Sequence, residues 1–140
     1  MTRQLIRLLR FAWPSPCSAV GALFALVVIS LGGSFKRVGG TIEVALREQQ
    51  IQVPGWAALS AFGGITLGHV IIGQSHELLV RLREHERVHV RQYEALGPLF
   101  FVAYPLASLW AGLRGRSPYS DNVFERQAHR QSLGGRENTA

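Results

Sequence analysis

The stretch from Phe11 to Phe35 contains no charged residue, and it restricts the possible folds of this chain more than any other feature. It exceeds the roughly 20 apolar residues that a membrane-spanning helix needs. We therefore predict that residues 1–35 form a hydrophobic membrane-anchor helix. A cleaved signal peptide, ending near the small residues Ser30 and Gly32, and a buried core helix are the alternatives. Basic residues flank the stretch on both sides: Arg3, Arg7 and Arg10 before it, Lys36 and Arg37 after it.

The composition also favours contact with a membrane. Of the 140 residues, 47% are hydrophobic and 17% charged, a balance more apolar than that of most small soluble domains. The formal charge of +6 comes almost entirely from arginine, which interleaves with glutamate and is accompanied by no nucleic-acid-binding signature. We expect membrane lipid rather than nucleic acid as a partner. The lone Cys17 excludes a disulfide framework and a cysteine-based zinc site.

The region after Lys36 changes to short segments with the character of strands. Residues 41–46 alternate in part with a period of two, and the run from Ile65 to Ile72 is rich in β-branched residues and bounded by glycines. These segments predict a small antiparallel sheet, with Ile65–Ile72 as one strand.

Three helices are predicted after the sheet. Ser75 is typical of an N-cap for a long helix that ends near Gly97 and Pro98. Residues 95–113 form a second uncharged stretch, interrupted by Pro98 and Pro105. Asp121 or Asn122 would cap the last helix, which we expect to end near Leu133, before Gly134-Gly135.

Together these elements predict an α+β fold: an N-terminal hydrophobic helix, a small antiparallel sheet, and then three helices. Residues 36–133 would form one small domain, whose character follows from the motifs below, and residues 134–140 a flexible tail. The long helix would carry the residues described next.

The segment His85-Glu86-Arg87-Val88-His89 is an H-E-x-x-H motif. On a helix, side chains four residues apart lie one above the other, roughly 5–6 Å apart, so His85 and His89 can take two corners of a tetrahedral zinc site. Glu86 can then reach a water at an open corner and act as a general base. The alternative is that both histidines are ordinary polar residues on an exposed helix.

A third ligand is expected, because catalytic zinc usually has three protein ligands. The acidic residues downstream of His89 are Glu94, Asp121, Glu125 and Glu137. Glu94 lies on the same helix and points away from the site, and Glu137 lies in the tail. We predict Glu125, on a helix that could cross the first; the alternative is a solvated helix charge.

This pattern, with Glu125 and Ala128 downstream, resembles the gluzincin clan of zinc metallopeptidases. Within that clan it is similar to the minimal gluzincins and to the membrane peptidases of the heat-shock and prenyl-protease type. The resemblance covers the region from Ile65 to His129, and only the two short motifs are specific. It implies His85, His89 and Glu125 as Zn²⁺ ligands, Glu86 as the base, and an upstream edge strand that pairs with extended substrate.

One position departs from those membrane families, which place an aspartate four residues after the glutamate ligand to support a zinc histidine. This chain has His129 there. We expect Asp121 or a backbone carbonyl to orient the imidazoles instead. Tyr119 and His129 are further candidates for stabilising the tetrahedral intermediate, and His69 for contacting substrate.

The ligand set also constrains the path of residues 95–113. A single crossing of roughly 30 Å of hydrocarbon there would separate the two histidines from Glu125. We therefore expect this stretch to fold back, as a core helix pair broken at Pro105 or as a re-entrant segment, because Pro98 and Pro105 interrupt it. The alternative is that Glu125 is not a ligand.

The function predicted from the sequence is a membrane-associated zinc metallopeptidase that hydrolyses a peptide or protein substrate with a zinc-activated water. The alternative is a non-enzymatic, zinc-stabilised membrane protein, in which the metal only holds helices together. That alternative predicts a closed, fully coordinated site without a groove beside the strand.

Overall fold

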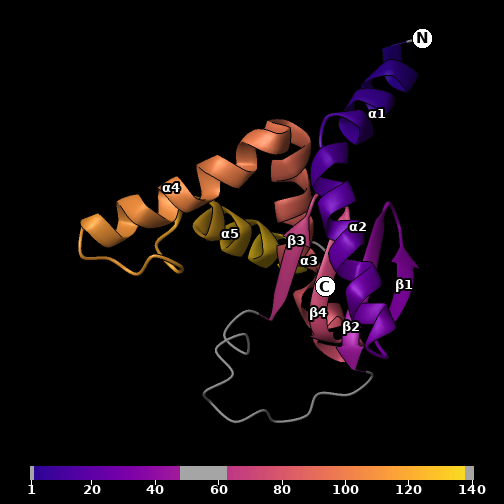
Figure 1. Cartoon of the computed structure of the whole chain (residues 1–140). Helices are drawn as coiled ribbons and strands as arrows, with labels where there is room; N and C mark the ends of the chain where they lie inside the picture. The colour runs from indigo at the N-terminus through magenta and orange to yellow at the C-terminus, as the bar shows by residue number, and fades with distance from the viewer. Residues whose placement is uncertain (1, 48–62, 138–140) are drawn as a thin grey trace.

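The computed structural model describes residues 2–47 and 63–137. The last three residues of the predicted tail lie outside this part. The described elements, shown in Figure 1, are the helices α1 (Thr2–Ala12), α2 (Ser15–Ser30), α3 (His76–Leu96), α4 (Phe100–Leu113) and α5 (Val123–Glu137), the 3-10 turn η2 (Gly97–Leu99), and the strands β1 (Ser34–Val38), β2 (Thr41–Arg47), β3 (Gly64–Leu67) and β4 (Val70–Ser75).

The sheet has the strand order β1-β2-β4-β3 and is mixed, so the prediction of an antiparallel sheet is wrong. β1 pairs with β2 and β3 with β4 in antiparallel fashion, but β2 and β4 run parallel. A parallel pair needs a long connection, which the chain between Arg47 and Val70 provides. Residue patterns mark a strand but not the direction in which it pairs.

The predicted single strand Ile65–Ile72 is instead a hairpin. The chain turns at Gly68 and His69, and β3 and β4 pair so that Ile65 lies opposite Ile72. Gly68 adopts a φ of 64°, a left-handed conformation that suits glycine. β3 thereby becomes an edge strand.

The N-terminal region is not one hydrophobic helix. It forms two helices, α1 and α2, bent by 51° at the break, and the strand β1 already begins at Ser34. Pro14 lies at the break, at the N-cap of α2. Proline has no N–H for a hydrogen bond in the preceding helix, so the chain changes direction there.

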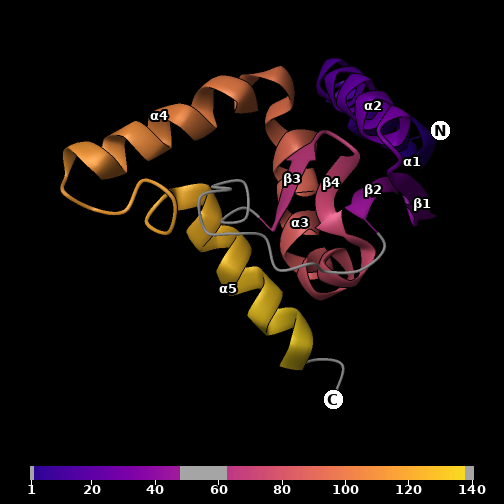
Figure 2. The same ribbon diagram turned by 60° about the horizontal axis from the view of Figure 1, so that its bottom comes forward.

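Helices α2 and α3 cover opposite faces of the sheet (Figure 2). Successive residues of a strand point to opposite faces, so β2 and β4 contribute to both cores. The core on the α2 side contains Ala25, Val44 and Val70, and the core on the α3 side contains Ala45, Ile71, Leu79 and Val90.

The caps of the two long helices agree with the sequence analysis. The Ser75 hydroxyl accepts a hydrogen bond from the Leu78 N–H at 3.2 Å, and Gly97 ends α3 with a φ of 55°. Asn122 Oδ1 accepts one from the Phe124 N–H at 2.9 Å at the start of α5. However, α5 runs to Glu137, beyond the expected end near Leu133.

Among the described residues, the helical stretch His76–Leu113 is long and apolar enough to span a membrane by length and composition, and α1 with α2 would qualify as a bent pair. The candidate span is therefore not the N-terminal helix that the sequence predicted. Its apolar part, α4, leaves side chains such as Leu106, Leu109 and Trp110 exposed. The expected fold-back within residues 95–113 is only partly seen: Pro98 lies in the turn η2, but α4 continues through Pro105 without interruption. The chain reverses after Leu113, and α5 then packs against α3.

A substitution at Gly21 tests how closely α2 packs on the sheet. A Cβ atom there would lie 2.8 Å from the Leu67 carbonyl oxygen and 2.8 Å from the Val70 Cβ. We expect Gly21→Ala to lower the free energy of unfolding by about 1–3 kcal/mol through overpacking. Thermal unfolding followed by circular dichroism would measure the change.

Gly134→Ala is the matched control, since nothing lies within 4 Å of its Cβ position in α5. Alanine is the better helix former, so this variant should be as stable as the wild type or gain up to about 1 kcal/mol. A Gly21→Ala protein as stable as Gly134→Ala would contradict the close packing.

Candidate metal centre

Three side chains from two crossing helices converge at one point. His85 and His89 extend from neighbouring turns of α3, and Glu125 comes from the first turn of α5. Glu125 Oε2 lies 3.1 Å from His85 Nε2, Glu125 Oε1 lies 3.3 Å from His89 Nε2, and the two Nε2 atoms are 3.2 Å apart. One potential ligand atom from each residue lies within 4.8 Å of the others, so the cluster could hold a metal ion.

The environment favours a charged Glu125 carboxylate although the side chain is only 7% exposed. Burial alone raises the pKa of Glu125, but hydrogen bonds from His85, His89 and Tyr104 outweigh it and hold that pKa well below its usual range. Carboxylates and imidazoles must be deprotonated to bind a cation. The carboxylate therefore meets this requirement over the ordinary pH range.

Gln92 orients His89 from the side opposite the cluster. His89 Nδ1 lies 2.8 Å from Gln92 Oε1, and the Gln92 amide nitrogen donates to the Phe124 carbonyl at 3.1 Å and to Gln127 Oε1 at 2.9 Å. With its nitrogen used in this way, the amide offers its oxygen to an Nδ1–H. In the neutral ring the lone pair of His89 is thereby left on Nε2, toward the cluster, whereas in the protonated ring Nε2–H donates to Glu125.

The sequence analysis predicts that Asp121 or a backbone carbonyl, and not Gln92, orients the imidazoles. Asp121 accepts a hydrogen bond from the Ser117 N–H at 3.0 Å and is not the partner of His89. The sequence signal for Gln92 was its position three residues after His89, on the same side of α3.

Tyr104 is a second residue that the sequence analysis missed. Its hydroxyl donates to Glu125 Oε1 at 2.6 Å. It reaches the carboxylate because α4 folds back over α5, where the completely buried Asn122 donates to the Tyr104 carbonyl at 3.1 Å and to Ser108 Oγ at 2.8 Å. No spacing pattern could have connected Tyr104 to Glu125.

Glu86 is held beside the cluster by the edge strand β3. It is only 4% exposed, and the Thr66 hydroxyl donates to Glu86 Oε2 at 2.7 Å. Gly64 leaves room for the carboxylate, since a Cβ atom there would lie 3.0 Å from Glu86 Oε1. The hydroxyl thereby fixes one oxygen of the carboxylate beside the cavity.

A cavity of about 370 Å³ opens onto these groups. Its polar wall contains the three cluster residues and Glu86, and β3 forms another side. Its apolar wall comes mainly from α3 and α4: Tyr93, Phe100, Phe101 and Pro105. The cavity thus joins a candidate metal site, a carboxylate and an edge strand.

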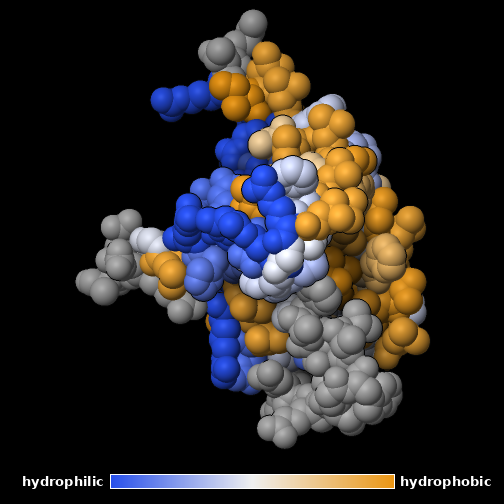
Figure 3. All heavy atoms as spheres, turned by 90° about the vertical axis from the view of Figure 1, so that its left-hand side faces the viewer, coloured by the Kyte–Doolittle hydropathy of each residue, from blue (hydrophilic) through white to orange (hydrophobic). Residues whose placement is uncertain are grey.

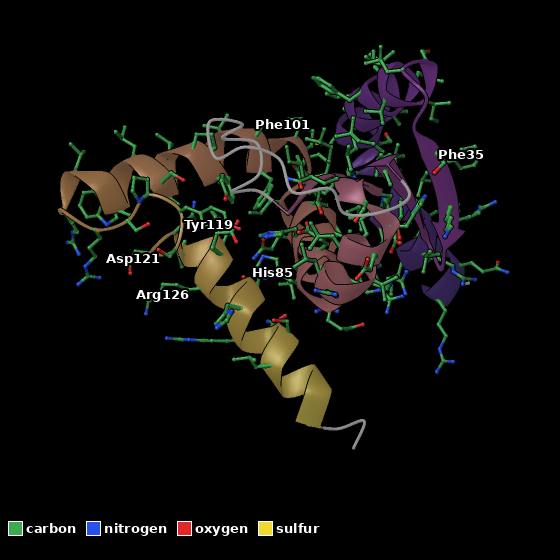
Figure 4. All side chains as sticks on the ribbon, turned by 90° about the horizontal axis from the view of Figure 1, so that it is seen from below. Phe35, His85, Phe101, Tyr119, Asp121 and Arg126 are labelled. Atoms are coloured by element: carbon green, nitrogen blue, oxygen red, sulfur yellow. The ribbon has the colours of Figure 1, made fainter. Side chains whose placement is uncertain are left out.

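Tyr119 lines this cavity as well, and Figure 4 shows it with His85 in the space between α3 and the start of α5. Burial and the nearby Glu125 carboxylate raise the pKa of Tyr119 to about 12, so its phenol keeps the proton near neutral pH. His129 is exposed on α5 and lines a neighbouring hollow of about 750 Å³ that also reaches His85 and Glu125.

His69 lies away from the cluster. Its Nε2 pairs with Glu94 Oε1 at 3.3 Å, and its ring stacks on Phe11 with the ring centres 4.5 Å apart. Its contacts join α1 to the rest of the fold, so the structure does not bring His69 together with the other predicted site residues.

Comparison of the chain with protein-family models, curated proteins and solved structures finds no match. The gluzincin resemblance therefore depends on the two motifs alone. The structure brings three residues of these motifs together, His85, His89 and Glu125.

The role of Gln92 leads to a prediction about metal affinity. Gln92→Leu removes the hydrogen-bond acceptor of His89, and loss of such a supporting contact typically weakens metal binding about 10- to 100-fold. Gln92→Glu keeps an acceptor and should bind metal more tightly than Gln92→Leu. Competition with a chromophoric chelator would measure the affinities.

Gln131→Leu, at an exposed position of α5, is the control for the same chemical change and should leave the affinity unchanged. Equal affinities for Gln92→Leu and Gln131→Leu would show that Gln92 does not orient a ligand.

Proposed function

We propose that this chain is a membrane-associated zinc metallopeptidase. The observation that carries the proposal is the cavity shared by the His85, His89 and Glu125 cluster and by Glu86. Two imidazole nitrogens and one carboxylate oxygen form a common ligand set of catalytic zinc, which keeps a fourth position for water or substrate. The burial of Glu125 and His89 gives the cation a site of low polarity with few competing waters.

Bound there, zinc would supply a water of lowered pKa and polarise a carbonyl oxygen. Glu86 takes the proton of the attacking water and passes it to the leaving amine, while Thr66 keeps its carboxylate in place. The protonated phenol of Tyr119 donates a hydrogen bond to the oxygen that becomes negative in the tetrahedral intermediate.

The substrate in this proposal is an extended peptide. β3 is at the edge of the sheet and lines the cavity, so its free backbone groups can pair with a further strand. Pairing there places a peptide bond beside Glu86 and the cluster. The apolar wall from α4 then accepts a hydrophobic side chain.

The non-enzymatic alternative requires a metal enclosed by protein ligands. The cavity beside β3 argues against it, because a purely structural zinc site is closed by four protein ligands. Among the described residues, the cluster supplies three. Glu86 of α3 is buried next to the cavity, where it forms no ion pair with any of the described residues and accepts a hydrogen bond from Thr66.

Membrane association is supported by the many large apolar side chains left exposed on α1, α2 and α4. They include Leu8, Leu23, Val27, Leu106 and Trp110, each more than half exposed. Contiguous apolar surface on this scale is typical of a membrane or protein contact.

The ligand set is tested by metal analysis of purified protein. We expect about one zinc per wild-type chain, and a large loss of bound zinc in His85→Ala, His89→Ala and Glu125→Ala, because each removes one of three ligands. His129→Ala and Glu84→Ala, at exposed positions, are controls that should retain the metal. Full zinc occupancy in all three ligand variants would end the proposal.

The base is tested separately. Glu86→Gln should keep zinc but lower the cleavage of an unfolded protein such as labelled casein by about 10²- to 10⁴-fold, since an amide cannot accept the proton. Glu84→Gln, an exposed change of the same kind on α3, should cleave like the wild type. An active Glu86→Gln protein would remove Glu86 from the mechanism.

A further inference from the structure

The apolar side of helix α1 is uncovered. On a helix, residues three and four positions apart share one side, so Leu5, Leu8, Leu9 and Ala12 lie together. The three leucines are 57%, 67% and 57% exposed, respectively. An amphipathic helix of a soluble domain normally turns this side toward the core, and α1 does not.

The arginines of α1 gather on the other side. Arg3, Arg7 and Arg10 follow each other at four- and three-residue steps, and the helix contains no acidic residue. With Gln4 and Ile6 they line a shallow hollow of about 320 Å³. At the top of Figure 3, where α1 lies, hydrophobic and hydrophilic atoms point to opposite sides.

Two contacts fix how α1 is oriented on the fold. Arg10 Nε donates to Glu94 Oε2 of α3 at 2.9 Å, and Phe11 stacks on His69 in the turn between β3 and β4. Both contacts come from residues outside the leucine side of the helix. The leucines are therefore directed away from the protein.

The apolar surface continues onto α2, where Leu23, Phe24 and Val27 are each more than half exposed. The opposite side of α2 packs on the sheet through Gly21 and Ala25, and Cys17 packs on Tyr93 and Phe100. A helix of 16 residues is only about 24 Å long, shorter than the roughly 30 Å of hydrocarbon.

The sheet attached to α2 also argues against a crossing. Within the described part of the chain, its edge strand β1 pairs on one side only, and unpaired backbone groups cannot be satisfied within hydrocarbon. Contact with one face of a bilayer covers the exposed leucines without burying the sheet.

We propose that α1 docks on a bilayer surface that contains anionic phospholipids. The helix lies in the plane of the membrane, with Leu5, Leu8 and Leu9 at the boundary of the acyl chains and with Arg3 and Arg7 among the lipid phosphates. Apolar insertion on one side and basic residues beside it are the two features of interfacial helices. Through Arg10 and Glu94, docking also holds α3 and its cavity near the membrane surface.

This inference rests on the membrane association in the proposed function, but not on zinc or on peptidase activity. Its test is therefore flotation of the purified full chain with two kinds of vesicle. One kind is phosphatidylcholine alone, and the other is phosphatidylcholine with about one third phosphatidylglycerol. We expect the wild type to float with the anionic vesicles and much less with the neutral ones. Raised salt should weaken the binding, because it screens the charges.

The decisive variant is Arg3→Gln with Arg7→Gln, which leaves the Arg10 ion pair intact. Each basic residue near an anionic surface strengthens binding about fivefold, so losing two should weaken it about 25-fold. Arg126→Gln with Arg130→Gln makes the same charge change at exposed positions of α5, and binding should change by less than about threefold. Leu5→Gln with Leu9→Gln should weaken binding at least about tenfold.

Far-ultraviolet circular dichroism of each variant checks that it is folded. Equal binding of the wild type to neutral and anionic vesicles would overturn the inference, as would equal binding of the Arg3→Gln/Arg7→Gln and wild-type proteins. A wild type that forms dimers and does not float would assign the apolar side to a second copy. None of these outcomes bears on metal binding, which is measured separately.

Discussion

The crossing of α3 and α5 is the contact on which the candidate site depends. It places a buried carboxylate, Glu125, between two imidazoles of another helix. Burying a carboxylate is costly unless charge or hydrogen bonds compensate, and here His85, His89 and Tyr104 all do so. A bound cation would meet the same need, because it replaces hydrogen bonds with stronger ligand bonds.

The surrounding fold supports this crossing from three directions. Gln92 connects α3 to α5 through Phe124 and Gln127, and Asn122 ties the start of α5 to α4. The sheet supplies the Thr66 hydroxyl, which holds the Glu86 carboxylate of α3 next to the crossing. Each supporting group is itself hydrogen-bonded, and this is what gives a site fixed geometry rather than mere proximity.

The apolar segments serve two purposes in this arrangement. The inner residues of α4, such as Phe100 and Tyr104, complete the cavity, while its outer residues remain exposed with those of α1 and α2. The Arg10–Glu94 ion pair connects the basic side of α1 to the helix that carries the histidines. In the proposed arrangement, α3 therefore carries two ligands of the peptidase site and also holds the lipid-binding helix α1.

The sequence alone determined the features that depend on neighbouring residues. The four-residue step between His85 and His89 sets their separation on a helix, and Ser75, Gly97 and Asn122 mark helix ends through local hydrogen bonds or φ preferences. Glu125 was predicted because, unlike Glu94 and Glu137, it lies on a helix that could cross the first. The fold-back of the chain was then a consequence of that choice, since the two sides of a bilayer cannot share an ion.

Only the tertiary structure decided what depends on contacts between distant segments. The parallel pairing of β2 with β4 follows from packing that no periodicity encodes. Tyr104 reaches Glu125 for the same reason. A pattern of residues specifies which face of an element is apolar, but the partner of that face, and its direction, are chosen by the free energy of the whole fold.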